Sequence, residues 1–342
     1  MHASTDLRVG LLGYGIAGAV FHAPLIAATP GLRLSAVVTA NPERKAQVAA
    51  DQPGTLVLDR ADQLWTEELD LVVVATPNRT HVPLATEALD AGFAVVVDKP
   101  FAPTAEEARK LSAHARELGL PLAVFHNRRW DNDFRTVRQL IEAGELGTVH
   151  RFESRFERWR PTPKGGWREL GDPAEAGGAL YDLGSHLIDQ ALQLFGPVRS
   201  VYAELDRRRA GVQVDDDSFV ALTHKSGVRS HLWMGALTPQ LGPRMRVLGD
   251  KAGYVKFGLD GQEDALRAGN RPGGPEWGVE PGSLSGQVGV DGSLRRVTSV
   301  PGAYQDFYAL MRDAVRGEGL VPVTPEEAIA VLEVIEQART EA

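Results

Sequence analysis

A short apolar run followed at once by three regularly spaced glycines limits the possible folds of this chain more than any other feature. Residues 9–12 predict a strand buried on both faces, and Gly13, Gly15 and Gly18 follow it with the spacing G-x-G-x-x-G. An alanine-rich stretch then predicts a helix. Such a unit suits a dinucleotide, because the glycines allow a tight turn and close backbone approach while the helix N-terminus supplies partial positive charge.

The second predicted strand, at residues 32–39, bears on the choice of cofactor. In nicotinamide enzymes an acidic residue at this strand end favours NAD, whereas a basic residue accommodates the 2′-phosphate of NADP. Here the strand ends in Thr39, Ala40 and Asn41, and Arg44 and Lys45 follow. We therefore expect NADP(H) to be preferred, with NAD(H) possible. The alternative is that the two cations only cover an exposed helix.

Alternating strands and helices fill the first part of the chain. Strands are expected at residues 32–39, 55–58, 69–75, 93–97 and 120–125, and helices at 42–50 and after Thr104, where Thr104 and Glu107 form a capping-box pattern. This alternation predicts a doubly wound parallel α/β sheet of the Rossmann type over residues 1–125.

The remainder, residues 126–342, has a different pattern. Strand-like segments follow one another at 149–156, 198–205, 218–224, 228–234, 245–248 and 254–257, a loop is expected at 272–286, and helices return at 304–315 and 325–338. The pattern predicts an α+β domain with a large, mostly antiparallel sheet. Leu232 and Met234 alternate with Trp233, so one face of this sheet is available for a second copy of the chain.

Composition excludes several functions. The 342 residues are enough for two domains, and the absence of cysteine excludes disulfides, thiolate catalysis and cysteine metal sites; no metal is expected. The net charge is −8, and the cations at 207–209 lie near the aspartates at 215–217, which predicts a solvated hairpin end and no nucleic-acid partner. No segment resembles a signal peptide or a membrane span, so we expect a cytoplasmic protein without a membrane partner.

Loops at the carboxyl ends of parallel strands line the ligand crevice of such sheets. The candidate cofactor-binding residues are therefore Gly13, Tyr14, Gly15, Ile16, Ala17, Gly18, Thr39, Asn41, Arg44, Thr76, Pro77, Asn78, His81, Asp98, Lys99, Asn127 and Arg128.

Residues 177–193 carry a second chemical pattern. Asp182 and His186 are four residues apart, so they share one face of a helix. A histidine can accept and return a proton near neutral pH, which makes His186 a candidate general base. The spacing alone also fits an ordinary surface pair, and both interpretations stay open on this evidence.

Several motifs together resemble the Gfo/Idh/MocA oxidoreductases over essentially the whole chain. They are the glycine turn, Asp98-Lys99-Pro100 in place of the family's E-K-P, and Asp182 with His186 as its D-x-x-x-H. The longer strings at 126–134, 181–190 and 260–269 are most similar to the NADP-dependent scyllo-inositol dehydrogenase branch. Asp98 replaces the usual glutamate. It keeps the negative charge, but its side chain is shorter, so the carboxylate reaches less far.

The resemblance implies a chemistry and a set of roles. It implies an NAD(P)-dependent oxidoreductase acting on CH–OH groups, which moves a hydride between nicotinamide and a secondary hydroxyl or ketone of a cyclic polyol or sugar, inositol-like in type. Lys99, Asp182 and His186 would be catalytic, with His186 as proton acceptor and Lys99 as the cation that orients the hydroxyl. The family also implies a homodimer or homotetramer through the C-terminal sheet.

Residues that could contact the substrate are less specific, and a structural role suits each equally well. They are Arg128, Trp130, Arg158, Trp167 and Arg168. Two other functions remain as alternatives: a non-catalytic NADP(H)-binding sensor or regulatory protein, and a reductase of the same fold acting on a dihydrodiol or a bile pigment.

Overall fold

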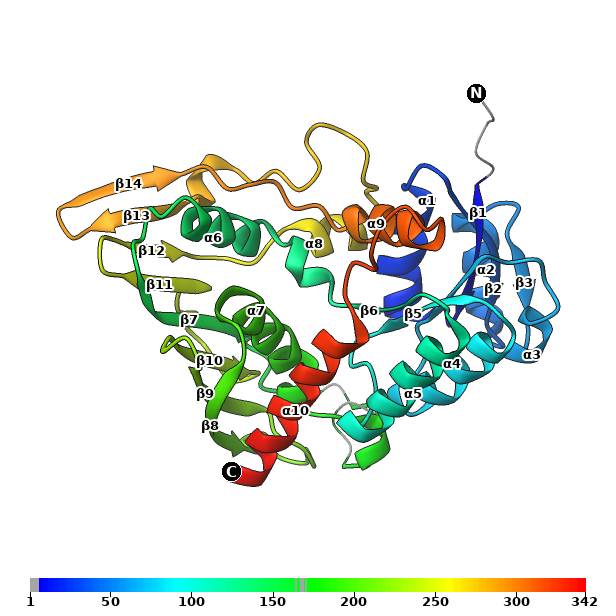
Figure 1. Ribbon diagram of the computed structural model, residues 1–342, viewed down its shortest axis with the longest axis horizontal. Helices are drawn as coiled ribbons and strands as arrows, with labels where there is room; N and C mark the ends of the chain where they lie inside the picture. The colour runs from blue at the N-terminus through cyan, green and yellow to red at the C-terminus, as the bar shows by residue number, and fades with distance from the viewer. Residues whose placement is uncertain (1–5, 164, 167–168, 170) are drawn as a thin grey trace. The chain divides into compact units, whose positions relative to one another are not determined.

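The computed structural model describes residues 6–163, 165–166, 169 and 171–342 (Figure 1). Trp167 and Arg168, two of the expected substrate contacts, lie outside the described residues. The chain divides into two compact units. Unit 1 contains the chain up to Asn127 together with 262–277 and 303–329, and unit 2 contains 128–261, 278–302 and 330–342. We expected a division after residue 125; the later segments 262–277 and 303–329 also belong to unit 1.

Unit 1 is built on a six-stranded sheet in the order β3-β2-β1-β4-β5-β6, in which neighbouring strands are parallel. Its strands are β1 (Leu7–Leu12), β2 (Leu32–Val38), β3 (Leu56–Leu58), β4 (Leu71–Val74), β5 (Ala94–Asp98) and β6 (Leu122–Phe125). The strand order reverses at β1, as in a doubly wound sheet, which confirms the predicted fold of this part.

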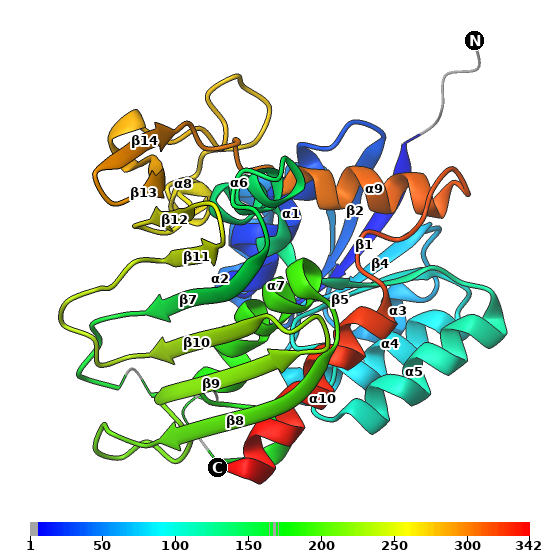
Figure 2. The same ribbon diagram turned by 60° about the vertical axis from the view of Figure 1, so that its left-hand side comes forward.

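The helices that connect these strands are η1 (Ala17–His22), α1 (Ala23–Ala27), α2 (Pro42–Asp51), α3 (Ala61–Leu64), η2 (Asn78–Thr80), α4 (His81–Asp90) and α5 (Ala105–Leu118). Two later helices, α8 (Gln262–Arg267) and α9 (Gln305–Val315), also belong to unit 1. The residues of η3 (Asn127–Trp130) and α10 (Pro325–Glu341) are divided between the two units. Figures 1 and 2 both show α4 and α5 side by side. The predicted cap of α5 is present, because Thr104 Oγ1 accepts the Glu107 N–H at 3.2 Å.

The turn after β1 brings backbone against backbone. Gly13 has φ +94°, and a Cβ there would lie 2.5 Å from the carbonyl oxygen of Ala75. A Cβ on Gly18 would lie 2.1 Å from the carbonyl oxygen of Gly13. The helix that follows starts as a π-helical segment, η1, rather than as the regular helix that the alanine-rich sequence predicts.

Unit 2 contains an eight-stranded sheet in the order β14-β13-β12-β11-β7-β10-β9-β8 (Figure 2). Its strands are β7 (Val149–Glu157), β8 (Val198–Asp206), β9 (Asp217–His224), β10 (Arg229–Gly235), β11 (Met245–Gly249), β12 (Gly253–Lys256), β13 (Gly286–Val290) and β14 (Ser293–Val297). The β7–β10 pair is parallel and the other neighbouring strands of this sheet are antiparallel, which confirms a mostly antiparallel sheet.

The helical elements of unit 2 include one that the sequence analysis did not predict. They are α6 (Asn132–Glu142), η5 (Pro173–Glu175), η6 (Leu180–Gly184), α7 (Ser185–Phe195) and η7 (Gly282–Leu284). Helix α6 was missed, as was α8 in unit 1, and so was the β13–β14 hairpin, most of whose residues are exposed. Exposed strands lack the apolar alternation on which prediction depends.

The sheet of unit 2 has one packed face. Leu232 and Met234 of β10 are fully buried, and the Met234 sulfur would lie 3.0 Å from a Cβ on Gly184 of η6, whereas Trp233 and the neighbouring Phe219, on the other face, are half-buried. The predicted alternation of this strand is therefore confirmed.

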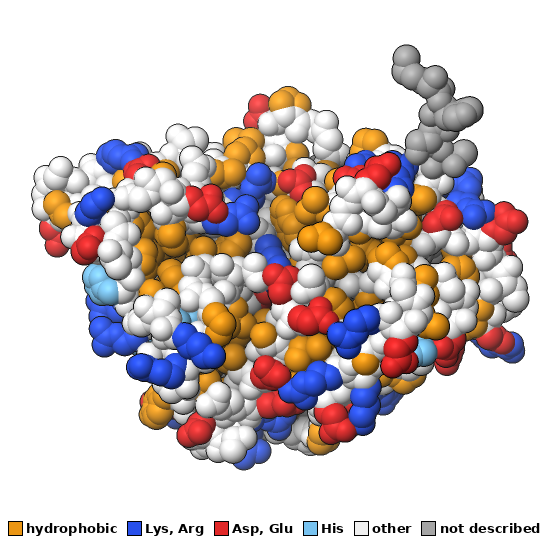
Figure 3. Space-filling model, in the orientation of Figure 1, with side chains coloured by type: hydrophobic (Ala, Val, Ile, Leu, Met, Phe, Trp, Pro, Cys, Tyr) orange, Lys and Arg blue, Asp and Glu red, His pale blue; other side chains and the backbone are white. Residues whose placement is uncertain are grey.

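Charges of both signs are mixed on one face of the molecule. On the face drawn in Figure 3, Lys and Arg side chains are interspersed with Asp and Glu. No helix in the described part of the chain is long and apolar enough to cross a lipid bilayer.

Replacing Gly18 by Ala should destabilise unit 1. The added Cβ would meet the Gly13 carbonyl at 2.1 Å, so backbone must shift, at a cost of about 1–3 kcal/mol in the free energy of unfolding. Gly15→Ala is the matched control, because its nearest neighbours, in the Arg44 side chain, begin at 3.9 Å, and it should change stability by less than about 0.5 kcal/mol. Urea unfolding followed by tryptophan fluorescence measures both. Equal losses in the two variants would contradict the packing argument.

Candidate functional site

The loops after β4 and β5 in unit 1 are joined by a buried histidine. One ring nitrogen of His81, Nδ1, lies 2.9 Å from the carbonyl oxygen of Pro100, and the other, Nε2, lies 3.0 Å from that of Thr76. Burial lowers the pKa of His81, and the nearby Asp98 carboxylate opposes that effect. His81 was expected beside the cofactor; its ring lies between the loops after β4 and β5, and the neutral imidazole that burial favours donates to one of the two carbonyl oxygens.

The same edge of the sheet carries the other expected polar residues of unit 1. Thr76 Oγ1 accepts a hydrogen bond from Thr80 Oγ1 at 2.7 Å, and Asn78 is 5% exposed. Thr39, at the end of β2, is also buried, and so is Asn127 after β6. These side chains lie at the carboxyl ends of parallel strands, where open α/β sheets bind ligands.

The end of β2 places a cation beside the glycine turn. The Arg44 guanidinium lies 3.9–4.0 Å from the position that a Cβ on Gly15 would occupy. Asn41 caps α2 by accepting the Arg44 N–H at 3.0 Å, which orients this turn of the chain. The neighbouring Lys45 is engaged in an ion pair with Asp59. Of the two predicted cations, Arg44 is therefore the one placed at the turn.

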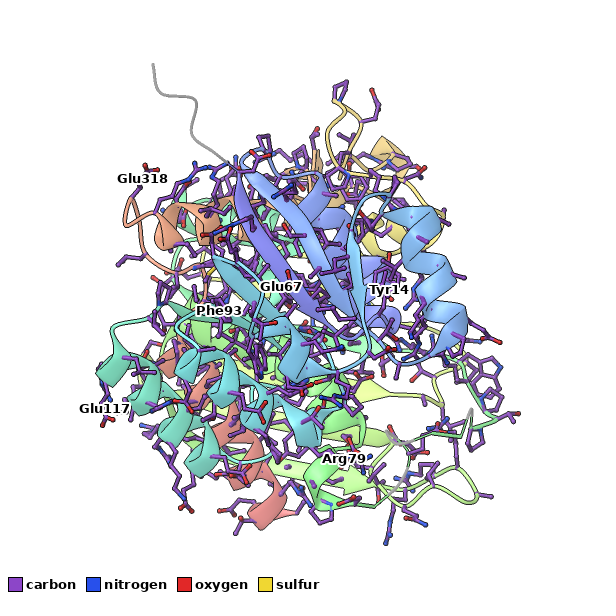
Figure 4. The ribbon with its side chains drawn as sticks, turned by 90° about the vertical axis from the view of Figure 1, so that its right-hand side faces the viewer. Tyr14, Glu67, Arg79, Phe93, Glu117 and Glu318 are labelled. Atoms are coloured by element: carbon purple, nitrogen blue, oxygen red, sulfur yellow. The ribbon has the colours of Figure 1, made fainter. Side chains whose placement is uncertain are left out.

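Two residues of the glycine turn differ in their surroundings. Ile16 is 54% exposed, whereas Tyr14 is buried and its hydroxyl lies 3.4 Å from Asp51 of α2 (Figure 4). Burial, followed by the charge of Asp51, raises the pKa of Tyr14 to about 12. Tyr14 thus packs the turn against α2, while Ile16 is available to a ligand.

Lys99 follows the last residue of β5. The Asp98 carboxylate accepts the backbone N–H of Lys99 at 2.9 Å. Burial by itself raises the pKa of Asp98, but His22, His81 and Lys99 outweigh burial and hold that pKa below its ordinary value. Asp98 is therefore an anion that stabilises the start of this loop.

In unit 2, the segment carrying Asp182 and His186 is not one regular helix. Asp182 lies in the π-helical turn η6, and His186 lies in the first turn of α7. The regular α-helix expected over residues 177–193 is therefore replaced at Asp182 by a π turn, and Asp182 and His186 remain about one helical turn apart. Asp182 is half-buried and His186 is 6% exposed.

An aspartate that the sequence analysis treated as solvated fixes the start of this segment. Asp215 accepts the Leu180 N–H at 2.7 Å and the Ser218 hydroxyl at 2.7 Å, and a Cβ on Gly178 would lie 2.1 Å from its Oδ1. The adjacent Asp216 is 3% exposed and accepts the Arg209 side chain at 2.8 Å. The predicted solvated hairpin end is therefore wrong for these two residues.

Guanidinium groups gather around one ring beside His186. The ring of Phe156 lies 6.5 Å from the His186 ring, and the Cζ atoms of Arg128 and Arg158 lie 4.5 Å and 4.8 Å from the Phe156 centroid. Guanidinium groups favour such positions over aromatic faces. Phe156 was missed, because a phenylalanine in a strand looks like any core residue.

Buried hydrogen bonds fix these side chains. Arg128 Nη1 donates to Asp131 at 3.2 Å, and Gln190 Nε2 donates to the Arg128 carbonyl at 2.9 Å. Arg244 binds the opposite end of the Gln190 amide at 3.1 Å and Asp133 at 2.9 Å. Burial, with smaller contributions from acidic neighbours, raises the pKa of Asp131 although Arg128 opposes it.

Asp189 and Trp130 also belong to unit 2. Asp189 pairs with Arg129, with a shortest separation of 2.6 Å, so this carboxylate is occupied within unit 2. Trp130, an expected substrate contact, is half-buried. Lys99 belongs to unit 1, and Asp182 and His186 belong to unit 2.

Comparison with known proteins assigns the family. Residues 7–126 match the oxidoreductase family with an NAD-binding Rossmann fold, and residues 134–255 match the GFO/IDH/MocA C-terminal domain. The chain is 45% identical to YdgJ, an uncharacterized oxidoreductase of Escherichia coli (strain K12), over 97% of this chain and 95% of YdgJ. The chain belongs to the GFO/IDH/MocA oxidoreductase family.

Relatives within the GFO/IDH/MocA family include a named dehydrogenase. IolW of Bacillus subtilis (strain 168), a scyllo-inositol 2-dehydrogenase (NADP(+)), is 36% identical over 97% of this chain and 92% of IolW. Among solved structures, the protein yvaA from Bacillus subtilis has a TM-score of 0.94 at 35% identity, covering 100% of this chain and 97% of yvaA. This GFO/IDH/MocA protein is therefore an NAD(P)-binding oxidoreductase, and the resemblance seen in its motifs is confirmed.

Proposed function

We propose that this oxidoreductase is an NADP-dependent dehydrogenase or reductase of a cyclic polyol or sugar, inositol-like in type. The relative IolW, which is similar over nearly the whole chain, carries that activity in its name. Shorter similarities point to the same substrate class: 34% identity to a D-apiose dehydrogenase over 51% of this chain, and 32% identity to an inositol 2-dehydrogenase over 43%.

The observation that carries the cofactor proposal is the position of Arg44. Arg44 lies in the first turn of α2, directly after the end of β2 where such cofactors place the adenosine ribose, and that strand end has no carboxylate to bind a ribose 2′-hydroxyl. A guanidinium binds phosphate oxygens through paired N–H groups. NADP therefore suits this turn better than NAD.

The surroundings of His186 support a hydroxylated substrate. The nearby guanidinium groups of Arg128 and Arg158 donate hydrogen bonds, which polyhydroxylated molecules accept at many oxygens. A bile pigment or dihydrodiol would instead favour a more apolar environment. A non-catalytic sensor has no need for the set Lys99, Asp182 and His186.

The roles of the proposed catalytic residues follow from their chemistry. When bound, the cofactor would supply the nicotinamide carbon as hydride acceptor for the carbinol carbon. His186 takes the hydroxyl proton, and Lys99 stabilises the negative charge that develops on the same oxygen. Asp182 accepts a hydrogen bond from a neighbouring hydroxyl. In the reductive direction His186 returns the proton.

The same face of the unit 2 sheet that shows Trp233 is proposed as the surface for a second copy, in a homodimer or homotetramer. Phe219 lies 5.1 Å from Trp233 and 6.5 Å from Tyr202 between ring centroids, and the Arg155 guanidinium lies 4.0 Å above Trp233. A row of aromatic rings with a stacked arginine has the composition of an interface core.

The basic test of function is an absorbance screen at the reduced-nicotinamide band, with NADP and NAD against inositols and aldoses. We expect NADP-dependent oxidation of at least one inositol. Cofactor binding without turnover of any polyol or sugar would favour the sensor instead.

Cofactor preference should depend on Arg44. Because Arg44→Ala removes a charged partner of the 2′-phosphate, we expect the KM for NADP to rise roughly 10- to 100-fold with little change for NAD. Asn41→Asp should shift preference toward NAD, since aspartate keeps the helix cap but repels the phosphate. Lys45→Ala is the control and should have a small effect, because Lys45 pairs with Asp59. A wild type that uses NAD better would overturn the proposal.

The proton acceptor can be identified by paired pH profiles. His186→Ala should lower kcat by ~10²–10⁴-fold with cofactor binding nearly intact, and the ionisation that makes wild-type alcohol oxidation rise with pH should disappear. Lys99→Ala should change both kcat and KM but keep that ionisation. His150→Ala removes an exposed histidine of β7 and is the control. If the ionisation persists without His186 and is lost without Lys99, the two roles are reversed.

Oligomerisation should depend on Trp233. We expect light scattering at micromolar concentration to show a dimer or tetramer for the wild type and a monomer for Trp233→Glu, because a charge would be buried in the aromatic row. Leu320→Glu changes a side chain that is 87% exposed in unit 1 and should leave the assembly unchanged. A monomeric wild type would count decisively against this interface.

A further inference from the structure

Unit 1 contains a fully buried histidine that the proposed reaction does not use. His22, at the end of η1, is 0% exposed and lies among aromatic rings. Its ring centroid is 4.3 Å from that of Phe125 and 6.1 Å from that of Tyr308. Burying an imidazole in such an apolar place is costly unless its nitrogens have polar partners.

Both ring nitrogens of His22 face polar groups. Nδ1 lies 2.6 Å from the hydroxyl of Tyr308, in α9, and Nε2 lies 3.8 Å from Oδ1 of Asp98, at the end of β5. Burial, and then the charge of Asp98, raise the pKa of Tyr308 well above its ordinary value, so the phenol keeps its proton.

These contacts select one arrangement of protons. If the Tyr308 O–H donates to Nδ1, an N–H on Nε2 faces the Asp98 carboxylate. The opposite tautomer would turn a nitrogen lone pair toward that anion and is disfavoured. At 3.8 Å the His22–Asp98 contact is longer than a hydrogen bond, so its contribution is electrostatic.

Asp98 connects this contact to Lys99. Its Oδ1, the atom nearest His22, also accepts the Lys99 N–H at 2.9 Å. On the other side of Lys99, the carbonyl of Pro100 faces His81 at 2.9 Å. The short aspartate side chain thus reaches back to its own loop, and the backbone on both sides of Lys99 is held by buried contacts.

We propose that His22, oriented by Tyr308, is a positioning residue that holds Asp98 and, through Asp98, sets the direction of the Lys99 side chain. The inference rests on the proposed function in one respect, because Lys99 is the group that acts on the substrate oxygen there. A shift of a catalytic cation by a fraction of an ångström weakens transition-state stabilisation more than it weakens cofactor binding.

The experiment compares two buried tyrosines. Tyr308→Phe removes the donor to His22 and little volume. Tyr254→Phe is the matched control in unit 2, because Tyr254 is also fully buried and its hydroxyl has no hydrogen-bond partner among the described residues. His22→Gln is a second variant, which keeps an N–H donor toward Asp98 but loses the aromatic ring.

In kinetics, we expect Tyr308→Phe to lower kcat about ten-fold with the Kd for NADPH unchanged, and His22→Gln to fall in the same direction. In a Lys99→Ala background, Tyr308→Phe should change kcat by about two-fold at most, because its effect passes through Lys99. Equal losses in both backgrounds, or a loss no greater than that of Tyr254→Phe, would overturn the inference.

A second readout needs no turnover. The rate at which acetic anhydride modifies Lys99, followed by peptide mass spectrometry, should rise several-fold in Tyr308→Phe and stay at the wild-type rate in Tyr254→Phe, because a loosened lysine is more accessible. A rate that does not rise in Tyr308→Phe overturns the positioning role whether or not the protein oxidises a polyol. A raised rate in a protein that turns over no polyol supports the positioning role and rejects the proposed function.

Discussion

The first helix of unit 1 must lie with its backbone against the turn that precedes it, and the nucleotide-binding architecture depends on that contact. A side chain at Gly18 would occupy the space of the Gly13 carbonyl, and one at Gly13 would meet the carbonyl of Ala75 at the end of β4. Glycine is the residue that permits this approach. The contact aims the helix N-terminus over the end of β1, where phosphate oxygens find N–H donors.

The parallel sheet also places other loops of unit 1 at the same edge as this turn. Because β1, β4 and β5 are neighbours and point the same way, their following loops emerge at one edge. The His81 ring lies between the loops after β4 and β5 and faces a carbonyl oxygen of each. The fold thus gathers segments that are more than twenty residues apart and then fixes them with buried polar contacts.

Unit 2 uses buried ion pairs for a similar purpose. Arg129 pairs with Asp189, Arg244 with Asp133, and each side chain is less than a tenth exposed. Such pairs contribute little net stability, since desolvation offsets their attraction, but breaking one leaves a costly buried charge. The first pair joins η3 to α7 and the second joins α6 to the segment before β11, and Arg244 also donates to Ser154 of β7. Arg128 and Phe156 lie beside His186 in this part of unit 2.

The sequence by itself determined the class of each sheet, the glycine turn, the family and most strand positions, because these depend on local spacing and on apolar periodicity. It did not reveal the exposed β13–β14 hairpin, whose strands bury little, nor the π turn that contains Asp182. Only the tertiary structure decided that Arg44 rather than Lys45 lies at the glycine turn, that Asp215 caps η6, and that His22 faces Asp98. The physical reason is that such contacts join residues far apart in the chain, and their partners are chosen by packing, which no local pattern records.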